Sequence, residues 1–222
     1  MRDSSGFRRK HMTEHAWIDE VVLALSFRRP EGLDWSPPSD ASFDKLTEVV
    51  GATVPVEYRY FLERYGGVIL GDEDFTVKAP IVEPCPWGEQ VRPEIFYPLI
   101  QGHTYSLEDQ LATYRGRIPT GVLPISDDAG GNQVCLDVAG AFPGSVWFWD
   151  HEQRWFKRDL QEASLALTAK GADGRRLSVH DIIRGWARLH ADQFDRPPDY
   201  MGMYRMASTF AEFLRSLRRL AY

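Results

Sequence analysis

Hydrophobic residues recur at helical spacing in three segments of the first third of the chain, and each segment predicts an amphipathic helix. The first stripe predicts a helix over residues 14–26, with Thr13 as its N-cap. The second follows a break at Pro37–Pro38, and the third ends at Gly66–Gly67, since glycine commonly follows the last turn of a helix. The stripes consist of Trp17, Ile18, Val21, Val22 and Leu25, then Phe43, Leu46 and Val50, then Tyr58, Phe61, Leu62 and Tyr65.

The middle of the chain has a different pattern, in which short β-branched or aromatic runs are bounded by Gly, Pro, Asn or Asp. Such runs are typical of strands. Between them, Ser106 and Asp109 form a capping box at the start of a short helix. The runs are GVIL (67–70), FTVKA (75–79), EIFY (94–97), VLPI (122–125), QVCLDV (133–138) and SVWFWD (145–150).

The last part of the chain is helical again. Ser178 and Asp181 form a capping pair for a stripe that begins at Val179, and Thr209 and Glu212 do the same for a stripe over residues 210–217. Helices at both ends and a strand meander in the middle predict an α+β fold, because a parallel α/β sheet would need alternating strands and helices.

Composition limits the classes of protein that fit this pattern. The 222 residues are 43% hydrophobic, enough for one sizeable core, so we expect residues 14–222 to form a single domain behind a disordered leader over residues 1–13. No run of roughly 18 or more apolar residues is present, and the first residues lack the apolar stretch of a secretory signal. We therefore expect neither a membrane partner nor export by the general secretory route.

The net charge indicates which class of partner suits the chain, and the cysteine content indicates the redox state of its thiols. A formal net charge of -6 argues against direct nucleic-acid binding, which needs clustered positive charge, and makes a basic partner more suitable. Cys85 and Cys135 are too few for a disulfide framework. Reduced thiols in the cytoplasm are the expectation.

The stretch SDDAGGNQVCLDV, residues 126–138, contains the residues that most resemble a chemical site. Asp127, Asp128 and Asn132 offer hard oxygen ligands that suit calcium or magnesium, but their spacing does not match the D-x-[DN]-x-[DN]-G loop. Asp and Asn also cap turns, and Gly130–Gly131 would supply positive φ for a strand reversal. We therefore expect a turn here, with no metal and no cofactor.

The tetrapeptide Trp-Asp-His-Glu follows at the end of the last aromatic run. His151 and Glu152 would point to opposite faces of a strand, so they cannot share a metal ion there. An acid/base pair of Asp150 and His151 stays open as an alternative; together with Asp127 and Asp128 it defines a metal-assisted hydrolase. Motifs for a serine nucleophile, a phosphate loop and a dinucleotide site are absent, so we expect no catalytic residue.

The aromatic run itself has two interpretations. Trp147 and Trp149 alternate with Val146 and Phe148, so both faces of the strand are apolar or aromatic. This pattern is typical of a central strand covered on both sides. The alternative is that one tryptophan opens onto a partner's groove, because aromatic residues are enriched at interface hot spots.

Three blocks resemble the SUKH superfamily, which includes fungal cell-wall-assembly regulators of the Smi/Knr type and many bacterial toxin-immunity proteins. VPVEYRYFLERYGGV is similar to its helix-then-glycine block, VLPISDDAGGNQVCLDV with GSVWFWDHE to its central block, and MASTFAEFLRSL to its closing helix. The blocks occur in family order over residues 53–217. One departure is a helical insertion at about 159–205, which exceeds the short connection usual in the family.

The resemblance implies a non-catalytic α+β module with N-terminal helices, a central mostly antiparallel sheet and a C-terminal helix. It also implies a protein partner, most commonly a cognate toxin such as a nuclease or deaminase, whose active site the module covers. A regulatory scaffold is the alternative within the family. The acidic segment at 71–75, which opens a long acidic loop from Gly71 to Arg92, could then imitate a phosphate track. We expect the partner to contact Asp72, Glu73, Asp74, Asp127, Asp128, Trp149, His151 and Glu152.

Overall fold

The computed structural model describes residues 14–72, 74–103, 105–152, 200 and 202–221. The expected leader, Glu73 and most of the expected insertion at 159–205 lie outside the described residues. The chain divides into one unit of Met1–Trp149 with Tyr204–Tyr222, and a second unit of Asp150–Met203. The elements that carry the predicted signature blocks belong to the first unit.

Three helices form over the N-terminal stripes: α2 (Ala16–Ala24), α3 (Asp40–Val50) and α4 (Val56–Tyr65). α2 is shorter than the expected 14–26 and has His15 at its N-cap position, whereas the expected N-cap, Thr13, lies outside the described residues. The Ser39 hydroxyl caps α3 by accepting a hydrogen bond from the Ser42 N–H at 3.2 Å. Gly51 ends α3 in the left-handed region at φ 96°, where a side chain would be strained. Each helix buries the central residues of its apolar stripe.

Two of the three predicted capping pairs are confirmed, and the third, Ser178 with Asp181, lies outside the described residues. Ser106 accepts from the Asp109 N–H at 3.2 Å and begins α5 (Leu107–Thr113), and Thr209 accepts from the Glu212 N–H at 3.0 Å and begins α8 (Phe210–Ser216). The Glu212 carboxylate returns a bond to the N–H of Ser208, one residue before the cap, at 2.9 Å. None of the described helices has the length and apolar character that crossing a membrane requires.

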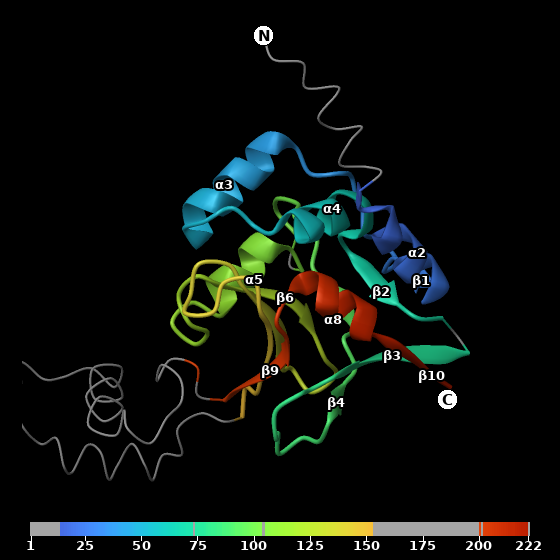
Figure 1. Cartoon of the computed structure of the whole chain (residues 1–222). Coiled ribbons are helices and arrows are strands. Elements are labelled where there is room, and N and C mark those ends of the chain that lie inside the picture. The colour runs from blue at the N-terminus through green and yellow to red at the C-terminus, as the bar shows by residue number, and fades with distance from the viewer. Residues whose placement is uncertain (1–13, 73, 104, 153–199, 201, 222) are drawn as a thin grey trace, which may run out of the picture. The chain divides into compact units, whose positions relative to one another are not determined.

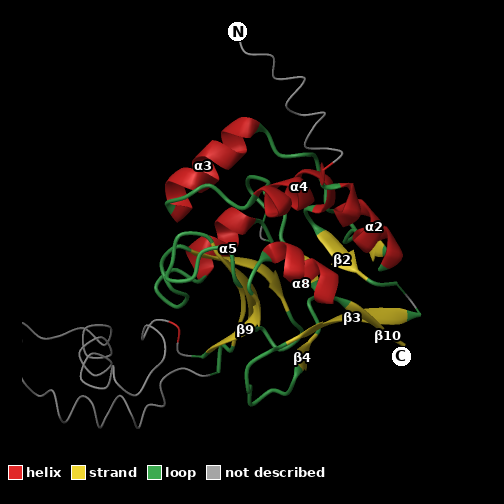
Figure 2. Cartoon of the chain, in the orientation of Figure 1, coloured by secondary structure: helices red, strands yellow, loops and turns green. Residues whose placement is uncertain are grey.

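The main sheet has seven strands in the order β1-β2-β5-β6-β7-β8-β9, and the successive pairs from β1 to β8 are antiparallel. Figure 2 shows the strands in yellow and the helices in red. Together with the helices this sheet confirms the predicted α+β fold. The strands are β1 (Phe27–Arg28), β2 (Val68–Leu70), β5 (Ile95–Phe96), β6 (Val122–Asp127), β7 (Gln133–Asp137), β8 (Val146–Trp149) and β9 (Met203–Ala207).

A second sheet corrects the expectation of a long acidic loop from Gly71 to Arg92. This segment contains β3 (Phe75–Pro80) and β4 (Gln90–Val91), which pair with each other and with β10 (Arg218–Ala221) in the order β10-β3-β4. β3 alternates buried and half-buried residues, so one of its faces packs on the core. The open connections are the turn at 71–74 and the loop between β3 and β4.

The core lies between one face of the main sheet and the neighbouring helices α2, α4 and α8 (Figure 1). Aromatic rings connect the layers: Phe61 of α4 contacts both Phe96 of β5, at 5.2 Å between ring centroids, and Phe210 of α8, at 5.6 Å. All four β8 residues are buried, which confirms the prediction of a strand covered on both faces. Val146 and Phe148 belong to this core, whereas Trp147 and Trp149 face the other side of the sheet.

A polar network ties α2 to α4. The Asp19 carboxylate accepts hydrogen bonds from the Tyr60 hydroxyl at 2.8 Å, the Tyr65 hydroxyl at 2.6 Å and the Arg64 guanidinium at 2.8 Å. Burial, together with the nearby Asp19 charge, raises the pKa of Tyr60 and of Tyr65 to about 12. Both hydroxyls therefore stay protonated and keep donating across the physiological pH range.

Candidate partner-binding surface

Three connections that carry acidic residues lie at one edge of the main sheet. β6 ends and β7 begins at this edge, where Asp127 pairs with Gln133. β5 also begins at this edge, since the N–H of its first residue, Ile95, donates to the Asp127 carboxylate at 3.2 Å. β2 runs antiparallel to β5, so β2 ends at the edge where β5 begins. We call the described carboxylates of these connections the acidic edge: Asp72, Asp74, Glu94, Asp127 and Asp128.

The Asp128 side chain holds the turn between β6 and β7. One oxygen, Oδ1, accepts from the backbone N–H groups of Gly130 and Asn132, each at 2.9 Å, and Oδ2 accepts from the Asn132 side-chain amide at 3.0 Å. The Asp128 N–H also donates to the Asn132 backbone carbonyl at 3.1 Å, which closes the hairpin. The predicted turn is confirmed, and it occupies both oxygens of this carboxylate.

The two glycines of this turn have different roles, which corrects the expectation of positive φ at both. Gly131 has φ 82° and supplies the left-handed residue of the reversal. Gly130 is not in that region, but a Cβ there would lie 3.2 Å from the Asn132 amide nitrogen and 3.3 Å from Asp128 Oδ1. Gly130 therefore leaves room for the hydrogen bonds of Asp128.

Asp127 lies one residue earlier and is half-buried. Its carboxylate accepts from the Ile95 N–H, and its backbone carbonyl accepts from the Glu94 N–H at 2.8 Å. Burial raises the pKa of Asp127 to about 6, against the backbone hydrogen bonds that lower it, and the charges of Glu94 and Asp128 make a smaller contribution in the same direction as burial. This carboxyl group thus titrates closer to neutral pH than an ordinary aspartate does.

Two tyrosines and a glutamine form a hydrogen-bonded chain near Asp127. The Tyr97 hydroxyl donates to the Gln133 side-chain oxygen at 2.9 Å, and the Gln133 amide donates to the Tyr114 hydroxyl at 3.0 Å. Burial raises the pKa of both tyrosines above its ordinary value. Tyr114 packs edge-on against Trp149 with 5.4 Å between centroids, and the exposed Arg117 guanidinium lies 5.4 Å from each of these two rings.

Trp149 reaches the same edge of the sheet because it pairs with Gln133 on the neighbouring strand. Its side chain is only 6% exposed, covered in part by Tyr114 and Arg117. A partner at this position would first meet Arg117 and Tyr114, which sequence reasoning did not single out. In the sequence these two residues are marked only by a Tyr-x-x-Arg spacing at the end of a helix. Their proximity to Trp149 depends on the tertiary fold.

The turn between β2 and β3 has the same local chemistry as the Asp128 turn. The Asp72 carboxylate accepts from the backbone N–H groups of Asp74 at 3.0 Å and Phe75 at 3.3 Å. Asp74 is exposed, and Glu73 lies outside the described residues. Gly71 has φ 103° and has Phe75 O within 2.8 Å of where its Cβ would be, so this position requires glycine.

The remaining predicted residues follow β8 in the second unit. β8 ends at Trp149, so His151 and Glu152 lie in a turn, which corrects the strand geometry expected for them. Asp150 is buried, and its carboxylate accepts from the Glu152 N–H at 2.9 Å. His151 is half-buried and Glu152 is exposed. Partner contact by Trp149, His151 and Glu152 stays a prediction.

Four aspartate side chains of the predicted sites accept hydrogen bonds from the backbone. Asp72, Asp127, Asp128 and Asp150 each accept at least one backbone N–H of a neighbouring turn or strand. Within the described part of the chain, no three His, Cys, Asp or Glu residues are grouped so that they could hold a metal ion. The arrangement presents negative charge on rigid turns.

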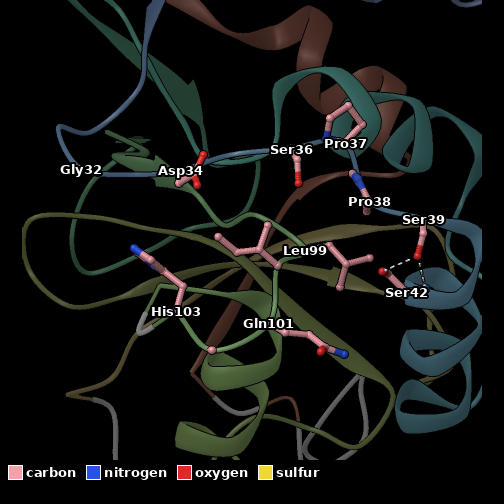
Figure 3. Close-up of a pocket in the computed structure, with 12 residues that line it drawn as sticks. Gly32, Asp34, Ser36, Pro37, Pro38, Ser39, Ser42, Leu99, Gln101 and His103 are labelled. Carbon is pink, nitrogen blue, oxygen red and sulfur yellow. Dashed lines mark hydrogen bonds between the residues drawn. The ribbon is translucent and has the colours of Figure 1, made fainter.

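A pocket of about 560 Å³ lies elsewhere on the same unit (Figure 3). Its polar side chains include Ser39 and Ser42, whose hydroxyl oxygens are 3.0 Å apart and belong to the N-cap of α3. None of the predicted partner-binding residues lines it. The lining residues are Gly32, Asp34, Ser36, Pro37, Pro38, Ser39, Ser42, Leu99, Ile100, Gln101, Gly102 and His103.

Comparison with known proteins identifies the family. The sequence model of the SMI1 / KNR4 family (SUKH-1) matches residues 37–163, which is more than half of the chain. The SPbeta prophage-derived uncharacterized protein YokK of Bacillus subtilis (strain 168) is 34% identical over 128 residues. That alignment covers 52% of this chain and 65% of the relative, so the chain spans less than two thirds of that relative's length. No solved structure matches the chain.

The matched region contains α3, α4 and the central β6–β7–β8 block, and all five carboxylates of the acidic edge lie within it. It thus includes two of the three signature blocks, in the family's order. On this match the chain belongs to the SMI1 / KNR4 family (SUKH-1).

Proposed function

We propose that this protein is an immunity protein, which binds a cognate bacterial toxin in the cytoplasm and neutralises it by covering its active site. The family to which the chain belongs includes toxin-immunity proteins. A relative of the chain is described as prophage-derived. The proposed mechanism is steric and electrostatic, and no residue of the chain performs a reaction in it.

The observation that carries the proposal is the acidic edge. Three connections, far apart in sequence, bring five carboxylates to one edge of the sheet. A toxin that acts on nucleic acid, such as a nuclease or a deaminase, needs a basic cleft to hold phosphates. An anionic surface fits such a cleft, and complementary charge accelerates association and selects the partner.

The rigidity of this surface supports the same function. Asp72 and Asp128 are fixed by the backbone donors of their own turns, and Asp127 by the start of β5. A preformed surface loses little conformational entropy on binding, so more of the interaction energy remains as affinity. Tyr114, Arg117 and Trp149 beside the acidic edge are of the residue types that dominate interface hot spots.

Co-expression with the toxin tests the function directly. The toxin gene is expected beside the gene of this protein, because a cell that makes the toxin needs both products. Cells that express the toxin alone should stop growing, and cells that express both should grow at the normal rate. A toxin that remains fully active when this protein is present at equal or higher level would contradict immunity, whereas rescue without a stable complex would contradict occlusion.

A further inference from the structure

The loop between β3 and β4, residues 81–89, exposes two large apolar side chains. Val82 is 64% exposed and Trp87 is 51% exposed. A tryptophan held half in water forfeits much of the stabilisation that its burial would supply. Tryptophan is enriched at interface hot spots, so Trp87 on this ordered loop is a candidate contact residue. Trp87 lies outside the acidic edge, and no part of the proposed function so far uses it.

This loop is fixed at several points along its length. The Ile81 N–H donates to the Glu89 carbonyl at 2.8 Å and closes the base, and the Gly88 N–H donates to the Cys85 carbonyl at 3.0 Å to form the turn that carries Trp87. Pro84 and Pro86 restrict the backbone in between. Gly88 has φ 107°, which L side chains rarely adopt, so the turn depends on glycine at this position.

Two further bonds join the loop to β9. The Val82 N–H donates to the Arg205 carbonyl at 2.9 Å, and the Arg205 N–H donates to the Glu83 carboxylate at 3.0 Å. The side chain of Cys85 packs against the core. Trp87 is therefore presented by a structure that is ordered before any partner arrives, which lowers the entropy lost when a partner covers it.

We propose that Trp87 is an anchor of the toxin interface, inserted into an apolar pocket of the toxin whose rim carries Lys or Arg. The proposal rests on the proposed function. Charge argues for this occupant, because the loop that carries Trp87 also carries Glu83 and the exposed Glu89, and the chain has a net charge of -6. A second copy of the chain, nucleic acid or an anionic membrane would bring like charge to these carboxylates, whereas a basic protein brings the opposite charge.

The test uses the toxin encoded beside the gene, inactivated in its catalytic centre, titrated against the full-length protein by surface plasmon resonance. Trp87→Ala should raise the Kd by about 30-fold or more, mainly through faster dissociation, as expected for a hot-spot tryptophan. Tyr105→Ala is the matched control, because Tyr105 is 49% exposed but lies on another connection. Its Kd should stay within about threefold of the wild-type value.

Protection from oxidation supplies a second measurement that does not depend on a variant. N-bromosuccinimide should oxidise Trp87 in the free protein, and the toxin should protect it in the complex, as read by peptide mass spectrometry. If the wild type binds the toxin but Trp87→Ala binds equally well, or Trp87 stays reactive in the complex, the anchor is refuted and the immunity function stands. If the wild type does not bind the toxin, the function and the anchor are refuted together.

Discussion

The Asp128 carboxylate accepts a hydrogen bond from the Asn132 side-chain amide, with 3.0 Å between Oδ2 and Nδ2. These two residues are among the strongest candidates for metal ligands in the sequence, and the structure shows them bound to each other across a tight turn. Both ends of the turn are fixed by the same side-chain pair. Negative charge at this edge is therefore part of the architecture of the β6–β7 hairpin.

Removing the Asp128 carboxylate should destabilise the fold. Asp128→Ala leaves the N–H groups of Gly130 and Asn132 and the Asn132 amide without their acceptor, so the free energy of unfolding should fall by about 1–3 kcal/mol. Urea unfolding followed by circular dichroism measures this loss. Asp74→Ala, at an exposed acid of the same edge, should change it by less than about 0.5 kcal/mol. Equal effects of the two substitutions would contradict the role of Asp128.

The buried hydrogen-bond chain of Tyr97 and Gln133 should show strong coupling. Gln133→Leu leaves the Tyr97 hydroxyl buried without its acceptor and should cost about 1–3 kcal/mol. Tyr97→Phe removes that hydroxyl, so the double variant should be less destabilised than the sum of the two single variants. A double-mutant cycle by urea unfolding measures the difference. Strict additivity would show that the bond contributes nothing.

The raised pKa of Asp127 predicts that the stability contributed by this group falls as the pH rises. Its pKa is about 6 in the folded protein and near the ordinary value of 3.8 in the unfolded chain, so the folded state binds the proton more tightly. The stability from this group is fully present below about pH 4 and is lost as the pH rises through about 6. The charged groups that act on it are Glu94 and Asp128, and both charges favour the protonated form of Asp127.

Asp127→Asn isolates this contribution, because an amide oxygen can still accept from the Ile95 N–H. Relative to the wild type, the variant should gain stability between pH 4 and pH 7, and the gain should level off above the folded pKa. Unfolding by urea at several pH values measures it. A difference between variant and wild type that does not vary over this range would mean that Asp127 does not titrate as stated.

Charge on the acidic edge should control how fast the toxin associates. Replacing two exposed acids of the edge together, by Asp74→Asn and Glu94→Gln, should slow association at least about threefold at low salt and reduce its salt dependence. The dissociation rate should change much less. The matched control is Asp44→Asn with Glu48→Gln, which removes the same charge from exposed positions on α3. Stopped-flow association kinetics separate the two pairs.

Much of this fold could be predicted from local sequence patterns. Ser106 and Thr209 mark helix starts because a cap needs only residues that are three positions apart. The turn at Asp128 follows from residue types that favour reversals. By contrast, β4 has two residues and β10 follows a helix directly, so neither offers enough periodicity to be recognised.

The candidate site was less accessible to sequence reasoning. Asp72 and Asp127 are 55 positions apart in the sequence, and the register of β2, β5 and β6 brings both to the same edge of the sheet. Gln133 looks like an ordinary strand residue, yet it bridges Tyr97 and Tyr114 in the folded protein. Trp87 sits between proline and glycine, a context that predicts a turn but not the exposure of its side chain. Such relationships depend on tertiary packing, which local propensity does not encode.

Titration of the toxin's catalytic activity with this protein tests the central claim most directly. If the chain neutralises the toxin by covering its active site, activity should fall linearly with added protein and vanish at an equimolar ratio when both are well above the Kd. The loss should be reversed when high salt dissociates the complex, because covering leaves the toxin chemically intact. A toxin that keeps its full activity in the presence of excess protein would contradict the account.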